Sequence, residues 1–240
     1  METQATYQKS TQAESSNCRL EWLVLSQRPL LKAYLGDCMI LMASTADNYY
    51  DLAITDPPYG IGKDWEKRNN GREKYPNTTY ENIPVNEKYF QELRRVSKNV
   101  IIWGYNYYTE YLGSTNYLII WDKQSSDNDV FKYSKCEIAY TNLKIPCNIF
   151  SYPWDGYRMG SETGKSKIHP HQKPVALYRW LLKNYAKAGQ RIIDTHGGSF
   201  SSAVACHTEG YEIDICEIDK EYFDAGVKRF KEATCQLKMF

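Results

Sequence analysis

The residues Asp56-Pro57-Pro58-Tyr59 place an acid and an aromatic ring on either side of two prolines. They follow the mainly apolar run 51–55, which predicts a buried strand that ends at Asp56. Proline fixes φ and pushes the preceding residue into an extended conformation, so this backbone is stiff before anything binds. Such a shelf can direct a hydrogen-bond acceptor and a stacking ring at a ligand, whereas the alternative for this string alone is a tight turn.

A second candidate site is the turn Asp194–Ser199 (DTHGGS), between a predicted strand and a predicted helix. A glycine-rich turn exposes backbone N–H groups at the positive end of a helix, but neither GxGxxG nor GK[ST] is present. The Asp194 carboxylate would repel a pyrophosphate and attract an ammonium or sulfonium group. Glu217 ends the next strand and can accept from both ribose hydroxyls. Together they suit S-adenosylmethionine, with a tight turn that binds nothing as the alternative.

Short apolar strands alternate with helices along the chain, which predicts an α/β fold with a mostly parallel sheet covered on both faces. The predicted strands are 30–35, 51–55, 100–103, 117–121, 137–140, 191–193 and 212–216, and the predicted helices are 38–46, 86–97, 175–187, 201–209 and 220–231. Residues 1–20 are expected to form a disordered tail, and 21–240 a single domain. Within it, the polar segment 60–80 predicts a mobile loop and 144–168 a small, irregular target-recognition segment.

Composition narrows the class of protein. A chain of 240 residues with a net charge of +1 can bury one sizeable core, and any basic surface must be local. Seven cysteines without a CxxC pair argue against a disulfide framework or a zinc cluster, and the four histidines show no metal-ligand spacing, so we expect no metal. Without a membrane-length apolar run or a signal peptide, a cytoplasmic location is expected.

Three motifs follow one another along the chain: DPPY at 56–59, HPHQKP at 169–174 and DTHGGSFSSAVA at 194–205. In this order the chain resembles the beta class of amino-group DNA methyltransferases, whose circularly permuted motif order places DPPY before the glycine loop. The resemblance covers about residues 30–232. It implies a Rossmann-like, seven-stranded sheet, a small irregular recognition lobe, S-adenosylmethionine as the methyl donor, and transfer to an exocyclic amine of a base in double-stranded DNA.

The resemblance also implies roles for single residues. Asp56 and the Pro57 carbonyl would accept the two amine hydrogens, while Tyr59, held by Pro58, would stack on a base flipped out of the duplex. Asp37 would bind the cofactor's adenine and Lys173 its methionine carboxylate, with a turn and helix capping as the respective alternatives. The expected cofactor-binding residues are Asp37, Cys38, Lys173, Asp194, His196, Gly198, Ser199, Ser201, Ser202, Glu217 and Ile218.

Basic residues of the two irregular segments flank the predicted strand ends. The expected DNA-binding residues are Lys63, Lys67, Arg68, Arg72, Arg158, Lys165 and Lys167. A solvated surface is the ordinary alternative for such charge runs. Because members of the family often dimerise, a homodimer is left open, as is a restriction partner.

The chain departs from the family pattern at His171, Thr195 and Phe200, which replace a threonine, a proline and the second loop glycine. We expect Phe200 to be helical, with its ring turned away from the cofactor toward Pro174 and Tyr178; the alternative is a ring that intrudes into the pocket. The predicted function is adenine-N6 methylation of DNA. The alternatives are cytosine-N4 methylation, for which the family more often carries serine at the position of Asp56, and an inactive DNA-binding subunit.

Overall fold

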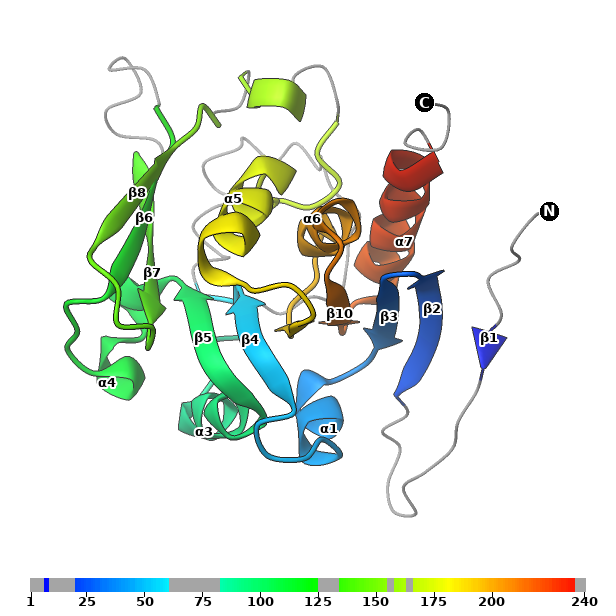
Figure 1. Cartoon of the computed structure of the whole chain (residues 1–240), viewed down its shortest axis with the longest axis horizontal. Helices are drawn as coiled ribbons and strands as arrows, with labels where there is room; N and C mark the ends of the chain where they lie inside the picture. The colour runs from blue at the N-terminus through cyan, green and yellow to red at the C-terminus, as the bar shows by residue number, and fades with distance from the viewer. Residues whose placement is uncertain are drawn as a thin grey trace.

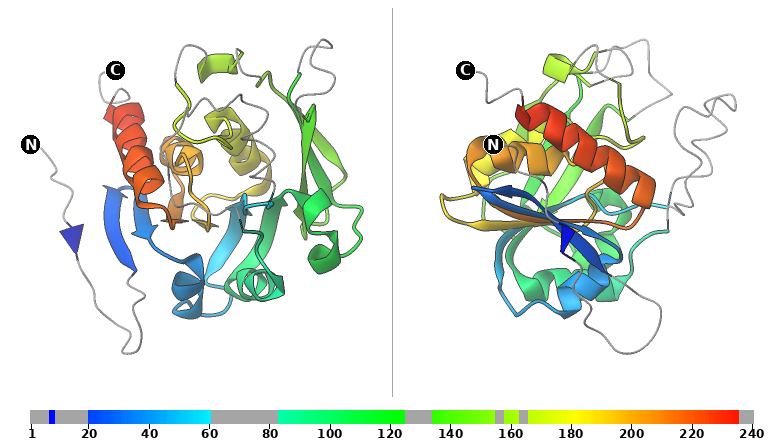
Figure 2. Two further views of the ribbon diagram at one scale, coloured as in Figure 1. Left: turned by 180° about the vertical axis from the view of Figure 1, so that it is seen from behind. Right: turned by 90° about the vertical axis from the view of Figure 1, so that its right-hand side faces the viewer.

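A computed structural model of the chain describes residues 7–8, 20–60, 83–124, 134–154, 158–162 and 166–235. A twisted sheet runs through the molecule, and helices cover both of its faces (Figures 1 and 2). Most of the predicted tail and of the predicted loop 60–80 lies outside the described residues. Within the described ranges, no helix has both the length and the apolar character needed to span a bilayer.

The sheet has ten strands in the order β1-β2-β3-β10-β9-β4-β5-β7-β6-β8. Its centre is parallel and consists of β3 (Leu30–Leu35), β10 (Glu212–Glu217), β9 (Arg191–Asp194), β4 (Tyr50–Thr55) and β5 (Ser97–Trp103). On one side β2 (Glu21–Gln27) is antiparallel to β3 and pairs with β1 (Tyr7–Gln8). On the other side lie β7 (Cys136–Thr141), antiparallel to β5, then β6 (Leu118–Asp122) and β8 (Asn148–Ser151). The predicted α/β, Rossmann-like class is confirmed.

All seven predicted strands are present, but the predicted count of seven is wrong, because β1, β2 and β8 widen the sheet to ten strands. The three missed strands lie at or beside the edges of the sheet. β1 and β8 are too short, at two and four residues, to show a periodic pattern, whereas β2 carries the apolar run 22–25 and was predictable from it. In β8, Ile149 is 56% exposed. β8 thus lies within the segment 144–168, which was expected to be irregular, and β1 lies within the predicted disordered tail.

The helices form two layers. One face of the sheet carries α1 (Cys38–Ala43), α3 (Glu87–Val96) and the short α4 (Thr109–Leu112), next to the 3-10 turn η1 (Tyr105–Tyr107). The other face carries α5 (Val175–Tyr185), α6 (Ser201–Glu209) and α7 (Lys220–Cys235); a second 3-10 turn, η3 (Gly160–Glu162), precedes α5 in the chain. All five predicted helices are present.

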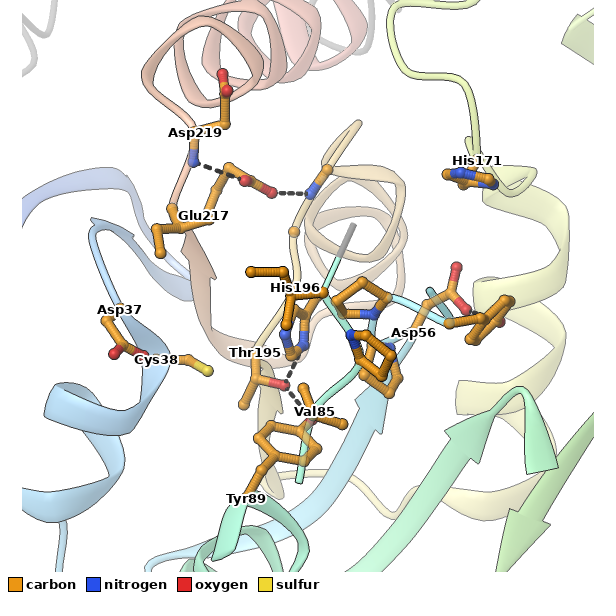
Figure 3. Close-up of a pocket in the computed structure, with 18 of the residues that line it drawn as sticks. Asp37, Cys38, Asp56, Val85, Tyr89, His171, Thr195, His196, Glu217 and Asp219 are labelled. Atoms are coloured by element: carbon orange, nitrogen blue, oxygen red, sulfur yellow. Dashed lines mark hydrogen bonds between the residues drawn. The ribbon is translucent and has the colours of Figure 1, made fainter. Parts of the chain in front are cut away.

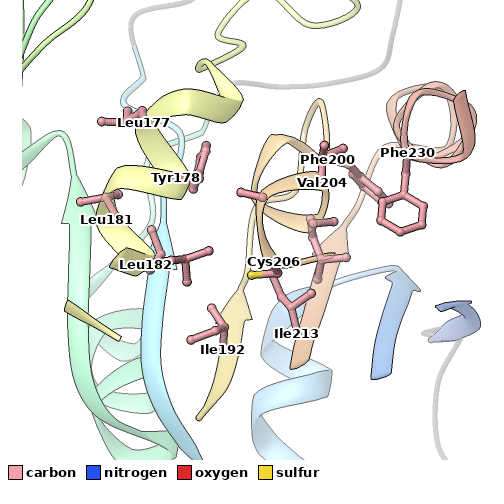
Figure 4. Packing of buried hydrophobic residues seen from close by; sticks show 14 of the residues in the cluster. Leu177, Tyr178, Leu181, Leu182, Ile192, Phe200, Val204, Cys206, Ile213 and Phe230 are labelled. Carbon is pink, nitrogen blue, oxygen red and sulfur yellow. The ribbon is translucent and has the colours of Figure 1, made fainter. Parts of the chain in front are cut away.

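The apolar stripe of α5 anchors the layer that carries the glycine loop. Leu177, Leu181 and Leu182 recur at helical spacing and are fully buried. Leu182 lies near Ile192 of β9, while Ile213 of β10 lies beneath α6 (Figure 4). Each fully buried leucine contributes about 1.5–3 kcal/mol relative to an exposed one. This packing fixes α5 and α6, and with them the loops that precede both helices.

The parallel centre of the sheet brings the predicted site residues together. Asp56 follows β4, Asp194 ends β9, and Glu217 ends β10. Gly36 and Asp37 follow β3, and the Gly36 N–H donates to the Glu217 carbonyl at 2.9 Å. Because parallel strands end at the same edge of a sheet, residues far apart in the chain surround one crevice, which is where open α/β sheets bind ligands.

Candidate active site

A cavity of about 750 Å³ opens at this edge of the sheet (Figure 3). Its size is typical of pockets for small molecules. The predicted residues that line it are Asp37, Cys38, Asp56, Pro57, Pro58, Tyr59, Lys173, His196, Gly198, Ser199, Glu217 and Ile218. The two sites proposed from separate motifs are therefore the two ends of one cavity.

Three predicted cofactor-binding residues, Asp194, Ser201 and Ser202, do not line the cavity but lie buried beneath the glycine loop. Asp194 accepts the Ser202 hydroxyl at 2.6 Å and the His196 backbone N–H at 3.1 Å. The Ser201 hydroxyl donates to the Lys173 carbonyl at 2.7 Å. Burial raises the pKa of Asp194 to about 7, even though both hydrogen bonds act in the opposite direction. In the structure this group therefore holds the loop, and its expected contact with the cofactor stays a prediction.

Glu217 joins the two loops that form the far wall of the cavity. Its Oε2 accepts the Gly198 N–H at 2.7 Å and its Oε1 accepts the Asp219 N–H at 2.9 Å (Figure 3). Its residue is 6% exposed, and burial raises the pKa of its carboxyl group. Each oxygen keeps a second lone pair for a hydroxyl donor. Asp219, which also lines this wall, was not predicted, although an acid two residues after Glu217 is visible in the sequence.

Asp37 stands opposite this wall at the start of α1. Its Oδ1 accepts the Met39 N–H at 2.8 Å and so caps the N-terminus of α1, while Oδ2 remains to accept a donor from the cavity. Burial raises the pKa of the adjacent Cys38 thiol to about 12 and keeps it neutral. With Asp37, Glu217 and Asp219 around it, this end suits ribose hydroxyls, an adenine amine and a cationic group, and is unsuited to a phosphate. These residues fit S-adenosylmethionine.

Two hydrogen bonds and one ion pair fix the DPPY backbone and its acid at the other end. The Tyr59 hydroxyl donates to Oδ1 of Asp56, and the Lys173 ammonium forms an ion pair with Oδ2. The Tyr108 hydroxyl donates to the Pro58 carbonyl. Asp56 is thereby presented to the cavity with one donor already on each oxygen.

Lys173 was expected to bind the methionine carboxylate, but the structure places its ammonium between two protein carboxylates. Besides Asp56 it contacts Glu137 at 2.8 Å, and the residue is 4% exposed. Burial alone would lower the pKa of Lys173, yet the two acids outweigh it and raise the pKa. Glu137 also pairs with Lys123 at 2.6 Å. Burial would raise the pKa of Glu137, but Lys173 and Lys123 lower it to about 2, so these groups stay charged.

The ring of Tyr59 is supported from behind. Tyr107 stacks on it with the ring centres 4.8 Å apart and the planes at 13°, and Tyr108 meets it edge-on at 6.2 Å. Gly104 has a left-handed φ of +79°, and a Cβ there would lie 2.1 Å from the Tyr59 ring. A glycine is therefore required at this position for the ring to lie where it does.

The glycine loop is tied to β4 by a buried hydroxyl cluster. Thr195 Oγ1 lies 2.7 Å from Thr55 Oγ1, 2.7 Å from the Tyr89 hydroxyl and 3.0 Å from His196 Nδ1. Burial lowers the pKa of His196 to about 4, so the ring is neutral. Thr195, which replaces the family's proline, thus supplies a contact that proline could not make.

His169 and His171 line the cavity, although neither was predicted to be a site residue. Burial lowers the pKa of both rings, that of His169 to about 3. Their position close to Lys173 in the HPHQKP motif was the sequence feature from which a place in the cavity could have been predicted. Among the described residues no group of histidine, cysteine and acid side chains could hold a metal ion.

The expected DNA-binding residues are only partly described. The Arg158 guanidinium donates to the Gln124 carbonyl at 2.8 Å. The Lys167 ammonium lies 5.1 Å from the ring centre of Trp154, which is buried. The remaining ones, Lys63, Lys67, Arg68, Arg72 and Lys165, lie outside the described residues.

Phe200 departs from the predicted conformation. Its φ of +57° and ψ of +27° are left-handed, so the predicted helical backbone is wrong. The ring is fully buried and does not line the cavity, as expected, but it packs toward α7 instead of Pro174 and Tyr178 (Figure 4). It meets Phe223 edge-on at 5.8 Å, and a Cβ on Gly226 would lie 2.5 Å from it. Gly226 makes room for the ring, so the cavity stays open.

Phe200→Gly is expected to destabilise the protein without changing its affinity for S-adenosylmethionine. Losing a buried phenyl ring lowers the free energy of unfolding by about 3–5 kcal/mol. Glycine adopts the left-handed backbone without strain, and this relief raises the free energy of unfolding again by about 1–2 kcal/mol. Denaturant unfolding should therefore show a net loss of about 1–4 kcal/mol. Phe223→Ala, the matched control, loses similar packing without that relief and should cost more. A several-fold gain in affinity for the donor in Phe200→Gly would show instead that the ring restricts the pocket.

Sequence comparisons with known proteins match DNA methyltransferases. The sequence model described as DNA methylase (N6_N4_Mtase) matches residues 76–228, more than half of the chain. The DNA adenine methyltransferase YhdJ of Escherichia coli (strain K12) is 24% identical over 247 residues, covering 83% of this chain and 82% of that protein. The type II methyltransferase M.HpaI of Haemophilus parainfluenzae is 24% identical over 221 residues, covering 76% and 68%.

Solved structures show the same fold. The M1.HpyAVI–SAM complex superposes with a TM-score of 0.56 at 18% identity, over 83% of this chain and 99% of that one. The cytosine-N4-specific PvuII DNA methyltransferase gives a TM-score of 0.57 at 14% identity, over 85% and 90%. The chain belongs to the family of amino-group DNA methyltransferases, which act on adenine N6 or cytosine N4 and depend on S-adenosylmethionine.

Proposed function

We propose that this protein is a site-specific DNA methyltransferase that transfers a methyl group from S-adenosylmethionine to adenine N6 of a base flipped out of double-stranded DNA. One observation carries the proposal: Asp56 and the DPPY shelf face the same cavity as the acids Asp37 and Glu217. An acceptor for an amine and a site for a cationic nucleoside thus share one space. The aspartate at the first DPPY position, and the likeness to an adenine methyltransferase, favour adenine.

The bound cofactor supplies an electrophilic methyl group next to a sulfonium. The chain's task is to make a poorly nucleophilic amine attack it, because the lone pair of N6 is delocalised into the ring. Asp56 and the Pro57 carbonyl accept the two N–H hydrogens, which favours a pyramidal nitrogen with its lone pair directed at the methyl group. Transfer to the nitrogen would form the N–C bond and break the C–S bond of the donor. The Asp56 carboxylate is placed to accept the proton that the methylated nitrogen releases.

Tyr59 stabilises the flipped base by stacking on it. Stacking on an aromatic ring is worth about 1–3 kcal/mol per base and offsets part of the stacking lost on flipping. Tyr107 backs this ring and is 45% exposed, so the stack continues toward the surface. Arg158 and Lys167, on the segment that leads to HPHQKP, are proposed to contact the phosphate backbone.

Cytosine-N4 methylation is the second candidate, supported by the likeness in fold to the cytosine-N4-specific PvuII enzyme. Both bases present an exocyclic amine with two hydrogens, and the same two acceptors serve either. An inactive subunit has less support, because Phe200 leaves the cavity open.

Expression in a host without DNA methylation, followed by direct sequencing of modified bases, tests the proposal. We expect N6-methyladenine in one recurring sequence context, and none when Asp56→Ala is expressed instead. N4-methylcytosine in its place would establish the second candidate. Unmodified DNA together with normal binding of S-adenosylmethionine by the purified protein would favour the inactive subunit.

Gly104→Ala is expected to slow methylation by displacing Tyr59. The new Cβ would lie 2.1 Å from the ring, so the ring must move, and the left-handed backbone adds about 1–2 kcal/mol of strain. Steady-state assays should show a raised KM for DNA and a reduced kcat, with donor affinity unchanged. Gly210→Ala is the matched control, because that glycine has nearly the same left-handed backbone (φ +83°, ψ +24°, against +79° and +29° at Gly104) but nothing within 4 Å of the added Cβ. Equal losses in both variants would show that only backbone strain matters.

A further inference from the structure

Four charged side chains alternate in sign behind the DPPY shelf. They come from four separate elements: Asp56 after β4, Lys173 before α5, Glu137 on β7, and Lys123 after β6. Lys173 contacts the first acid and lies 2.8 Å from the second, and Lys123 lies 2.6 Å from Glu137. We call these four side chains the charge row. Their charges sum to zero, so the row can be buried without a net charge.

We propose that Lys173, held in place by Glu137, is a positioning residue for methyl transfer that fixes the Asp56 carboxylate in its accepting orientation. The proposal rests on the proposed function of the cavity and adds to it a residue that is distant from DPPY in the chain. It assigns the lysine of HPHQKP to the amine end of the site and not to the cofactor.

The first reason is the way in which Asp56 is held. Lys173 occupies a lone pair of Oδ2 and the Tyr59 hydroxyl one of Oδ1, so the plane of the carboxylate is set from both sides. Each oxygen keeps a lone pair for the amine. Because a misplacement of about 1 Å can cost about 10²-fold in rate, a fixed plane matters for an acceptor that must shape a nitrogen lone pair.

The second reason is the surroundings of the ammonium. It lies 5.6 Å from the ring centre of Trp103 and 6.0 Å from that of Tyr59, within the range of cation–π attraction. Lys173 therefore contacts both the acceptor and the stacking ring of the DPPY shelf. A lysine that served only to stabilise the fold would not need to line the cavity, as this one does.

The third reason is Glu137, an acid in an otherwise apolar stretch of β7. Lysine side chains lose much rotamer freedom on burial, so a buried ammonium needs a fixed partner on its far side. Glu137 provides it, and Lys123 in turn holds Glu137. The lysine thus approaches Asp56 from one direction only.

The test uses single-turnover methyl transfer with saturating donor and DNA. Lys173→Met alone would leave two acids facing each other, so the informative variant is the double change Lys173→Met with Glu137→Gln, which keeps the row neutral through Asp56 and Lys123. We expect it to fold, to bind S-adenosylmethionine as the wild type does, and to transfer the methyl group about 10²-fold more slowly. Lys183→Met, on the exposed side of α5, is the matched control and should behave as the wild type.

A second readout separates positioning from stability. In Lys173→Ala, added methylammonium or ethylammonium should restore part of the rate as its concentration rises, and Lys173→Arg should keep more of the rate than the double variant. Wild-type transfer by the double variant, or a loss seen wholly as weaker donor binding, would overturn the proposal. A wild-type protein that methylates no DNA would instead refute the proposed function, whatever the variants do.

Discussion

Asp56→Ala is expected to abolish methyl transfer to DNA while S-adenosylmethionine binds almost as in the wild type. Removing a positioned acceptor or base commonly costs about 10²–10⁴ in rate. Donor affinity should persist because the acids expected to bind the cofactor, Asp37 and Glu217, lie at the ends of other strands, and neither is hydrogen-bonded to Asp56 in the structure. Single-turnover rates and calorimetric titration of the donor measure the two quantities separately.

The fold should survive this change because Lys173 keeps Glu137 as a partner. Asp51→Ala is the matched control: it removes an acid from the opposite end of β4, where Asp51 pairs with Lys98 at 2.7 Å, and should leave the rate unchanged. If Asp56→Ala lost donor binding but kept its turnover at saturating donor, Asp56 would belong to the cofactor end of the cavity.

Glu217→Ala is expected to weaken binding of S-adenosylmethionine by about ten- to a hundredfold, with turnover at saturating donor little changed. The lost charge-assisted hydrogen bond to ribose is worth about 1.5–3 kcal/mol, which gives that range. The same change removes the acceptor of the Gly198 and Asp219 N–H groups, so the two loops that form this wall of the cavity are no longer joined by these hydrogen bonds. Isothermal titration with the donor measures the effect.

Glu217→Gln separates the two contributions. The amide oxygen can still accept one N–H group, but the charge is gone, so an intermediate affinity is expected. Glu212→Ala, at the exposed start of the same strand, is the control and should bind the donor normally. Wild-type affinity in Glu217→Ala would remove this residue from the cofactor site.

The central strands and the common edge of the site were predictable because their signals are local. An apolar run, two prolines and an acid fix the end of β4, and an apolar run before Glu217 fixes the end of β10. Given a parallel sheet, these strand ends must meet, which places Asp56 and Glu217 at one crevice. The same local signals failed at β8, where an edge strand with exposed side chains carries no apolar pattern.

Tertiary structure alone decided the direction and partners of the side chains. Asp194 and Ser202 turn into the core to hold the glycine loop, and at a strand end no local pattern tells this from a turn toward the ligand. Lys173 meets Glu137 only because β7 pairs antiparallel with β5, a contact set by sheet order and not by spacing in the chain. Phe200 adopts a left-handed backbone because Gly226, on a different helix, leaves space for its ring, and burial of that ring outweighs the local strain.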